Sequence, residues 1–347
     1  MDKDKLIQVS EANAESFFPE SDFTIIGASF AGSLLASKLA KYGRVSLFDK
    51  TQPGTRLKCA GGIRAEEFEE LEIEIPHVKV NNIIISAGGK ISGFKSGYVV
   101  ADRRDIDAAV LKKAIAAGAV FRKAEYISHD PLKNIVKLRC GEEIADAAYK
   151  KLVLAKGFIS KPGGSFHGTS YVEIIEGQNK YEDSLYFKIL ENQIGYCWIF
   201  PLPGGRINIG IGSFSETPFA PSDFKKFKEE QNMDGRIICK GGGRIPMQPS
   251  ISVMKGNVCL FGDSAGMVLP INGEGLRYIS RTSGLWAKCI AEKKNLNFRW
   301  VFSRTFARLY ACSAAMRIII FAEKYLKKGL YSFLCRIGAS VRNLIRR

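Results

Sequence analysis

The chain has 347 residues, 46% hydrophobic and 25% charged, which is typical of a soluble globular protein with one large or two closely packed domains. Its net charge of +16 is uneven, since 14 basic and 2 acidic residues fall between Lys288 and Arg347. Eight scattered cysteines without a C-x-x-C pair favour reduced core thiols, and the lack of a run of about 18 uncharged apolar residues argues against a membrane-spanning helix.

The stretch Asp22–Lys50 contains the most informative pattern of secondary structure in the sequence. Residues 1–20 before it are polar and lack the apolar centre of a signal peptide, so we expect a loose leader and a cytoplasmic location. Phe23–Ile26 is a short apolar run typical of a buried strand, and Ser33–Tyr42 carries leucines one helical turn apart. Val45–Phe48 predicts a second strand. This order of strand, turn, helix and strand predicts a βαβ unit.

The turn inside this unit reads Gly27-Ala28-Ser29-Phe30-Ala31-Gly32. In dinucleotide-binding units such a turn lets a pyrophosphate rest on the N–H groups of the helix N-terminus, and an acid after the second strand accepts hydrogen bonds from ribose. Asp49 lies 22 residues after Gly27, close to the expected interval. Ser29 replaces the usual middle glycine, so an ordinary βαβ crossover without a nucleotide stays open.

The middle of the chain reads mainly as strands. Tyr186–Ile211 alternates strongly and predicts two antiparallel strands around Pro201-Leu202-Pro203-Gly204-Gly205. The other expected elements are an acidic helical turn at 66–72, short strands with a hairpin over 78–93, a strand leading into a helix over 98–117, and strands within 120–136 and 151–155.

A second glycine-rich segment follows the strand expected at Val258–Phe261. It begins Gly262-Asp263-Ser264-Ala265-Gly266 and continues to Gly273-Glu274-Gly275, where Leu276 starts a helix. Asp263 offers a carboxylate to ribose or ribityl hydroxyls, and a helix N-terminus free of bulky side chains offers N–H donors and partial positive charge. The alternative is a glycine-rich loop that only turns the chain.

Four motifs in this order resemble the geranylgeranyl reductase family of FAD-dependent enzymes. They are Cys59-Ala60-Gly61-Gly62-Ile63, Tyr196-Cys197-Trp198-Ile199-Phe200-Pro201, Asn208-Ile209-Gly210-Ile211-Gly212, and the run from Gly262 to Gly275. The resemblance implies an α/β fold like that of p-hydroxybenzoate hydroxylase. It divides the chain into a discontinuous Rossmann-like FAD-binding domain (21–160 and 251–290), an antiparallel-sheet substrate domain (161–250 with parts of 60–100) and a basic helical segment (291–347).

The same resemblance implies the residues around the cofactor. Arg103, followed by Asp107, matches the family's Arg-x-x-x-Asp pattern, and its guanidinium suits pyrophosphate or adenosine groups. The chain departs from the family at Ser29-Phe30 (usually Gly-Pro), at Lys156-Gly157 (usually Asp-Gly) and at Ser264 (usually Ala). The implied FAD-binding residues are Gly27, Ser29, Ala31, Gly32, Asp49, Lys50, Cys59, Gly61, Gly62, Arg103, Gly262, Asp263, Gly273, Gly275 and Leu276.

Cys59 is the candidate catalytic residue, as a proton donor or a redox thiol, with a packed thiol as the alternative. For the substrate site we expect an aromatic wall, because alternate residues of a strand share one face, with ordinary sheet core as the alternative. The wall residues are Tyr196, Trp198, Phe200 and Pro201. The three histidines, 77, 129 and 167, fall in no catalytic pattern, so neither a serine triad nor a metal site is expected.

The C-terminal segment combines apolar helical faces with many lysines and arginines. This pattern suits a helix lying on an anionic membrane, and would make the protein peripheral at the inner membrane face; the alternative is a helical cap on the substrate domain. Nucleic acid is not an expected partner, because no recognition module accompanies the charge.

The resemblance implies reduction of C=C bonds of a prenyl group on an isoprenoid lipid. Only one dinucleotide fingerprint is present, so the electron donor is expected to be transiently bound NAD(P)H or a small acidic redox protein that docks on the basic surface. Two alternatives stay open. One is a flavin-dependent monooxygenase or halogenase on the same fold, and the other is a non-catalytic lipid-binding protein that has lost FAD.

Overall fold

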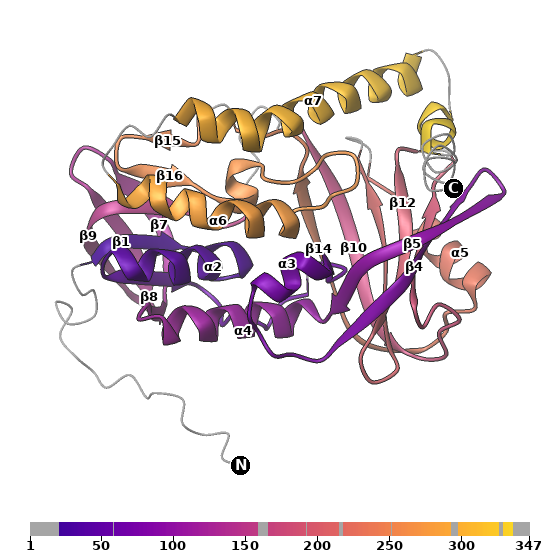
Figure 1. The fold of residues 1–347 in the computed structure, drawn as a ribbon, viewed down its shortest axis with the longest axis horizontal. Coiled ribbons are helices and arrows are strands. Elements are labelled where there is room, and N and C mark those ends of the chain that lie inside the picture. The colour runs from indigo at the N-terminus through magenta and orange to yellow at the C-terminus, as the bar shows by residue number, and fades with distance from the viewer. Residues whose placement is uncertain are drawn as a thin grey trace.

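Two eight-stranded sheets lie side by side in this computed structural model, with helices packed on the first sheet and across the top of both (Figure 1). The structure describes residues 21–57, 59–158, 166–191, 193–214, 218–250, 252–292, 298–325 and 329–335, with the side chains of 298–305 left out. The leader expected over 1–20 and the last twelve residues therefore lie outside the described part.

The first sheet is largely parallel and has the strand order β15-β16-β9-β1-β2-β6, as the expected Rossmann-like unit requires. A hairpin of β7 and β8 extends from β9. The strands are β1 (Ser21–Ile26), β2 (Val45–Asp49), β6 (Val120–Lys123), β7 (Glu125–Asp130), β8 (Ile135–Cys140), β9 (Glu143–Leu154), β15 (Met254–Lys255) and β16 (Val258–Leu260).

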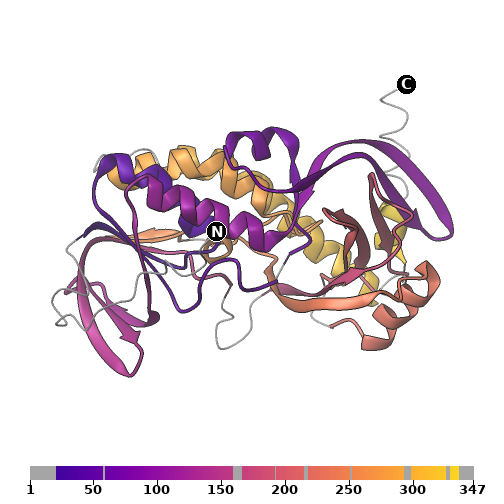
Figure 2. The same ribbon diagram turned by 90° about the horizontal axis from the view of Figure 1, so that it is seen from below.

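Three helices, α2 (Phe30–Leu39), α4 (Arg103–Ala116) and α6 (Leu276–Ala291), cover one face of this sheet, and the β7–β8 hairpin lies on the other (Figure 2). Helix α2 begins three residues before the predicted start at Ser33 and ends in a 3-10 turn. The apolar residues of α2 explain where this helix lies, because Leu34, Leu35 and Leu39 are buried against β1 and α4.

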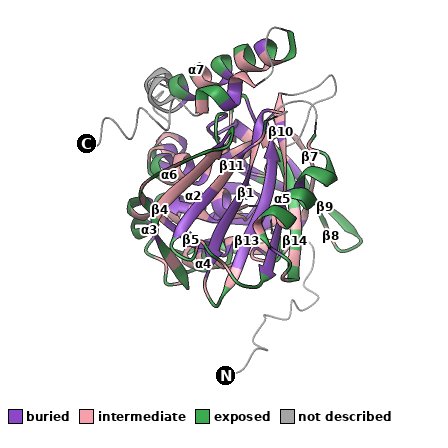
Figure 3. Cartoon of the chain, turned by 90° about the vertical axis from the view of Figure 1, so that its right-hand side faces the viewer, coloured by how far each residue is buried: buried purple, intermediate pink, exposed green. Residues whose placement is uncertain are grey.

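The second sheet is mainly antiparallel and has the order β14-β10-β13-β12-β11-β4-β5-β3. Its inner strands are buried, whereas α5 (Pro221–Gln231) presents an exposed face (Figure 3). The strands are β3 (Gly62–Arg64), β4 (His77–Ala87), β5 (Lys90–Ala101), β10 (His167–Glu176), β11 (Ser184–Ile189), β12 (Gly195–Leu202), β13 (Arg206–Ser213) and β14 (Arg236–Pro246). A short helix, α3 (Ala65–Glu70), follows β3.

One sequence expectation about this sheet was wrong. The region Tyr186–Ile211 contains three strands rather than two, because a polar turn after Ile189 separates β11 from β12. The alternation continues on both sides of that turn, so the pattern did not reveal the break. The expected turn at 203–205 does separate β12 from β13, and Gly204 and Gly205 adopt positive φ there.

The C-terminal part is helical where it is described, as expected. Helix α7 (Phe298–Tyr325) lies across α6 and buries Phe306, Leu309 and Met316, and a short helix follows at 330–335. Within the described residues every helix is too short or too polar to cross a membrane. Those residues also contain no cluster of three or more His, Cys, Asp or Glu side chains that could hold a metal ion.

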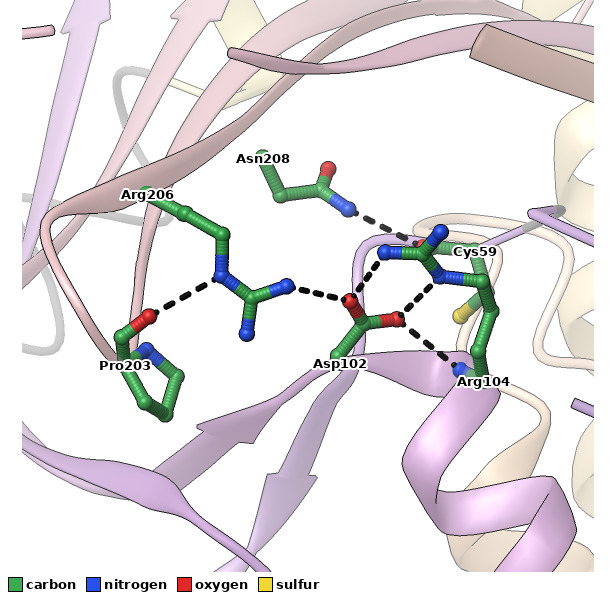
Figure 4. A network of polar contacts seen from close by, with 6 residues as sticks. All are labelled: Cys59, Asp102, Arg104, Pro203, Arg206 and Asn208. Atoms are coloured by element: carbon green, nitrogen blue, oxygen red, sulfur yellow. Dashed lines mark hydrogen bonds and ion pairs between the residues drawn. The ribbon is translucent and has the colours of Figure 1, made fainter. Parts of the chain in front are cut away.

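A buried carboxylate fastens the two sheets together (Figure 4). Asp102, which is 1% exposed, caps the start of α4 and accepts two hydrogen bonds from the Arg104 side chain. From the second sheet, Arg206 donates to the same carboxylate at 2.9 Å and to the Pro203 carbonyl at 3.1 Å. Burial opposes ionisation, but the hydrogen bonds from Arg104 and the charge of Arg206 lower the pKa of Asp102 below its usual value.

We predict that Asp102→Asn lowers the free energy of unfolding by about 2–3 kcal/mol at neutral pH, because two guanidinium groups lose a charged partner. Since the folded-state pKa is depressed, the wild-type advantage is complete at pH values above the unfolded pKa of about 3.9 and is lost as the pH falls through the lower folded value. Urea unfolding over a pH series measures this. Asp146→Asn, which breaks the exposed pair with Lys137, should change stability by less than about 1 kcal/mol.

Candidate functional site

A cavity of about 800 Å³ lies between the two sheets and is lined from both of them. One end is formed by the turn after β1 and by the end of β2. The middle is formed by Cys59, Arg103 and Asp263, and the far end by apolar side chains of the second sheet and of the 330–335 helix. The carboxyl ends of parallel strands are where open α/β sheets hold ligands, so this location agrees with a bound nucleotide.

The first turn can only be built from glycine at two positions. Gly27 has φ of +101°, and a Cβ there would lie 2.3 Å from the Ala155 carbonyl oxygen. A Cβ on Gly32 would lie 1.7 Å from the carbonyl oxygen of Gly27, so this glycine lets α2 sit directly on the turn. Ser29 lines the cavity at the N-cap of α2, and its side chain makes no capping hydrogen bond.

Phe30 does not fill the cavity. Its side chain is fully buried in the core, and its backbone N–H donates to Asp107 Oδ1 at 2.9 Å. Arg103 Nε donates to the same oxygen at 2.9 Å, so one carboxylate joins the start of α2 to the start of α4. Burial opposes the charge of Arg103, yet the carboxylates of Asp107 and Asp263 hold the pKa of this guanidinium above its usual range. The cavity wall therefore carries a fixed positive charge.

Asp49 lies at the end of β2, beside the turn after β1. One carboxylate oxygen accepts from the Ala28 N–H at 2.9 Å, and the other accepts from the N–H and hydroxyl of Thr51 at 3.0 and 3.1 Å. These contacts fix the carboxylate at the cavity, where it can accept hydrogen bonds from ribose hydroxyls. Lys50 also lines the cavity and pairs with Glu125 at 3.6 Å.

The late glycine-rich segment supplies the third wall. Asp263 lies in a 3-10 turn, η2 (Gly262–Ala265), and faces the cavity, and Ser264 ties this turn to the Gly157 carbonyl at 2.8 Å. Gly275 is the N-cap of α6, and no side chain caps that helix end. The start of α6 therefore presents its first N–H groups and its partial positive charge toward the cavity.

The aromatic wall is present as one face of β12. Tyr196, Trp198 and Phe200 all line the cavity. The indole lies flat over Gly210, where a Cβ would be 2.2 Å from Trp198 Cζ2, and its N–H donates to Asn208 at 2.8 Å. The motif that contains Asn208 and Gly210 therefore places the tryptophan.

Cys59 lies between the polar residues Arg103 and Asp263 and the aromatic wall. Its carbonyl accepts from Asn208 at 3.2 Å (Figure 4). The Gly61 N–H points at its sulfur at 3.5 Å. A Cβ on Gly62 would lie 3.1 Å from the Phe200 ring, so the segment 59–62 passes close to the aromatic wall. The thiol is half-buried and lines the cavity.

Most of the expected site residues meet at this cavity, and four do not line it. Gly32, Gly61 and Gly262 pack behind it, where their missing side chains allow close backbone contacts. Pro201 faces a separate hollow beside Arg206. The lining residues are Gly27, Ser29, Ala31, Asp49, Lys50, Cys59, Gly62, Arg103, Asp263, Gly273, Gly275, Leu276, Tyr196, Trp198 and Phe200.

Sequence reasoning missed a polar pair in the wall. Tyr98 donates to Glu274 Oε1 at 3.0 Å, and burial together with that carboxylate raises the pKa of Tyr98 to about 12. The residues are 176 positions apart, so no local pattern could join them. Lys156 also lines the cavity and lies over the Tyr126 ring at 3.7 Å, where burial lowers its pKa. Tyr331 and Cys335 close the apolar end.

Comparison with known proteins finds similar reductases, although no family model matches the chain. The chain is 26% identical to menaquinone reductase of Mycobacterium tuberculosis, over 88% of this chain and 85% of that protein. It is 28% identical to digeranylgeranylglycerophospholipid reductase of Methanosarcina mazei, over 74% and 71%. The similar protein of Thermoplasma acidophilum is 24% identical, over 78% of each chain.

Solved structures share the fold. A geranylgeranyl bacteriochlorophyll reductase-like protein of Thermoplasma acidophilum superposes with a TM-score of 0.69 at 19% identity, over 92% of this chain and 87% of that one. The flavin-dependent brominase Bmp2 superposes with a TM-score of 0.64 at 15% identity, over 93% and 90%. The mixed α/β fold with two sheets is therefore one that flavin-dependent proteins use, as the sequence predicted.

We predict that Gly210→Ala displaces the Trp198 indole and lowers the free energy of unfolding by about 1–3 kcal/mol, because the new methyl group overlaps the ring. Thermal unfolding and the tryptophan emission spectrum measure the two effects. Gly97→Ala is the matched control in a strand, since a Cβ there meets no atom within 4 Å, and it should leave both unchanged. An unaltered emission spectrum in Gly210→Ala would contradict the placement of the indole.

Proposed function

We propose that this chain, a member of the geranylgeranyl reductase family, is an FAD-dependent oxidoreductase that reduces C=C bonds of a prenyl group. One observation carries the proposal: a single cavity joins a nucleotide-type turn and the start of α6 to an apolar aromatic wall. A cofactor and an apolar chain can therefore meet in one cavity.

The side chains around the cavity fit FAD. The turn at Gly27 leaves no room for a Cβ, and Arg103 offers a partly buried positive charge to the pyrophosphate. Asp49 and Asp263 suit ribose and ribityl hydroxyls, and the N–H groups at the start of α6 suit the electron-rich edge of the flavin. When bound and reduced, FAD supplies a hydride for the alkene.

The chain itself contributes orientation and exclusion of water. Tyr196, Trp198 and Phe200 form a face against which an isoprenoid chain can lie extended, and Tyr331 closes the apolar end. We assign Cys59 as the proton donor to the substrate carbon, because its thiol lies between the polar wall and this face. Tyr98 and Glu274 form a second polar pair near the same place.

An isoprenoid lipid is the substrate class that this cavity suits, as the names of the similar reductases also indicate. The electron donor is proposed to be NAD(P)H bound transiently or a small acidic redox protein, since the net charge of +16 favours an acidic partner. We also retain association with an anionic membrane surface through the C-terminal segment, whose charge is strongly positive.

A monooxygenase or halogenase activity is the second candidate, because flavin-dependent brominases share the fold over most of the chain. Oxygen consumption with hydroxylated or halogenated product would favour it. The third candidate, a lipid-binding protein without FAD, rested on Ser29 and Lys156. The burial of Phe30 in the core weakens that alternative, since its ring leaves the cavity open.

The proposal predicts that the purified chain binds FAD and shows the absorption spectrum of an oxidised flavin. After chemical reduction without oxygen, a geranylgeranyl lipid should gain one H₂ in mass for each double bond reduced. Mass spectrometry of the lipid measures this, and enzyme left oxidised is the control. Unchanged lipids of several chain lengths, with flavin demonstrably bound, would remove prenyl reduction.

We predict that Cys59→Ala lowers kcat by about 100-fold, as expected for loss of a general acid, while the affinity for FAD changes little. Single-turnover reoxidation of the flavin by the lipid separates this step from substrate binding. Cys140→Ala, a half-buried cysteine on the distant β8 strand, serves as the matched control. An unchanged rate in Cys59→Ala would assign the thiol to packing.

A further inference from the structure

The outer side of the C-terminal end carries an apolar face. Along α7, Ile318, Phe321 and Tyr325 lie three and four residues apart, so they share one stripe of the helix. Phe333 and Leu334 on the short helix at 330–335, which follows α7 in the chain, are exposed as well. We call these five residues the C-terminal apolar face; their exposed fractions run from 41% to 69%.

This stripe is distinct from the one that packs on the protein. Met316 and Ala322 of α7 are buried, and Met316 joins a core cluster with Phe214 and Tyr331. Helix α7 is therefore apolar on two sides, and among the described residues only one of these sides is packed against the rest of the protein. Apolar and aromatic side chains grouped on an exposed surface mark an interaction site more often than scattered single residues do.

The tip of the β4–β5 hairpin lies at the same end of the molecule, as both ribbon views show (Figures 1 and 2). Ala87 at this tip belongs to the core cluster that contains Tyr331. Ile91, just beyond the tip, is 73% exposed, and Lys90 beside it is exposed as well. Two elements far apart in the sequence thus meet at this end of the molecule, and each carries exposed apolar and basic residues.

The charge of the C-terminal segment is almost entirely positive in its sequence. Arg317 and Lys324 are exposed on α7 beside the C-terminal apolar face, and residues 317–347 contain eight basic residues and one acidic residue. That acid, Glu323, is turned toward the chain, where it accepts the backbone N–H groups of Gly329 at 2.8 Å and Tyr331 at 2.6 Å. The surface therefore keeps its cationic character.

The same short helix borders the cavity. Tyr331 and Cys335 line the cavity from inside, and the Tyr331 hydroxyl donates to the Ile271 carbonyl at 3.3 Å. Phe333 and Leu334 point to the outside of this helix. One helical turn thus separates the apolar end of the cavity from the exposed apolar face.

We propose that the C-terminal apolar face and the β4–β5 tip dock on an anionic lipid bilayer, and that this docking brings the lipid substrate to the end of the cavity closed by the 330–335 helix. Aromatic and aliphatic side chains flanked by Lys and Arg are the chemistry of interfacial helices on anionic membranes. The delivery of substrate rests on the proposed function, whereas the docking itself does not.

The test uses the full chain loaded with FAD and sedimentation with vesicles. We expect binding to vesicles of phosphatidylcholine with phosphatidylglycerol, weaker binding to phosphatidylcholine alone, and release at high salt. Phe321→Ser with Phe333→Ser should lower the partition coefficient at least about tenfold. The matched control is Leu132→Ser with Ile144→Ser, two exposed apolar residues on the distant β7–β9 region, and it should bind as the wild type does.

The outcomes separate docking from function. Equal binding by the two double variants, or no binding by the wild type, would overturn the docking proposal. A dimer that dissociates in Phe321→Ser with Phe333→Ser, without any vesicle binding, would assign the face to contact between copies and would also overturn it. Vesicle binding through this face without prenyl reduction would leave docking intact and remove only the proposed reaction. Turnover of detergent-dispersed lipid should be the same in both double variants.

Discussion

The Asp107 carboxylate is the contact on which the geometry of the site depends. One of its oxygens accepts the N–H of Phe30 at the start of α2 and the Nε–H of Arg103 at the start of α4. It therefore fixes the end of the nucleotide-type turn relative to the guanidinium that faces the cavity. A buried charged pair of this kind contributes little net stability but strongly specifies geometry. The Asp107 contact also explains the position of Phe30. Its backbone N–H stays at the turn as a donor to Asp107, while its ring packs into the core.

A few buried polar contacts hold the second sheet to the region around Asp107 and the start of α4. Asp102 binds Arg206 from the β12–β13 turn, and Asn208 joins the Trp198 indole to the Cys59 carbonyl. These contacts fix the positions of the aromatic wall and the Cys59 thiol relative to the first sheet. Since the cavity exists only between the two sheets, these contacts determine whether an apolar chain can lie against a cofactor.

Local patterns in the sequence predicted the βαβ unit, the strand-to-helix passage at Arg103 and the shared face of Tyr196, Trp198 and Phe200. These features depend on residues close together in the chain, where periodicity and glycine positions are informative. The pairing of Tyr98 with Glu274 could not be predicted in this way, because long-range packing creates it. The position of Tyr331 at the end of the cavity could not be predicted either, because long-range packing also creates it.

Some expectations failed or stay predictions for physical reasons. Pro201 was grouped with the aromatic wall by its motif, but it lies where β12 leaves the cavity and faces another hollow. The extra strand at Ser184–Ile189 was hidden because the alternation continues on both sides of the short turn that separates it from β12. The division of the chain into domains and the roles of the individual site residues remain predictions.

The most direct measurement is a crystal structure of the chain with bound FAD. We expect the pyrophosphate at Gly27 and Ser29 beside Arg103, and the flavin ring between the start of α6 and Trp198. A flavin bound elsewhere, or a cavity filled by protein side chains when the crystals are grown with excess FAD, would contradict the central claim that one space holds both cofactor and apolar chain.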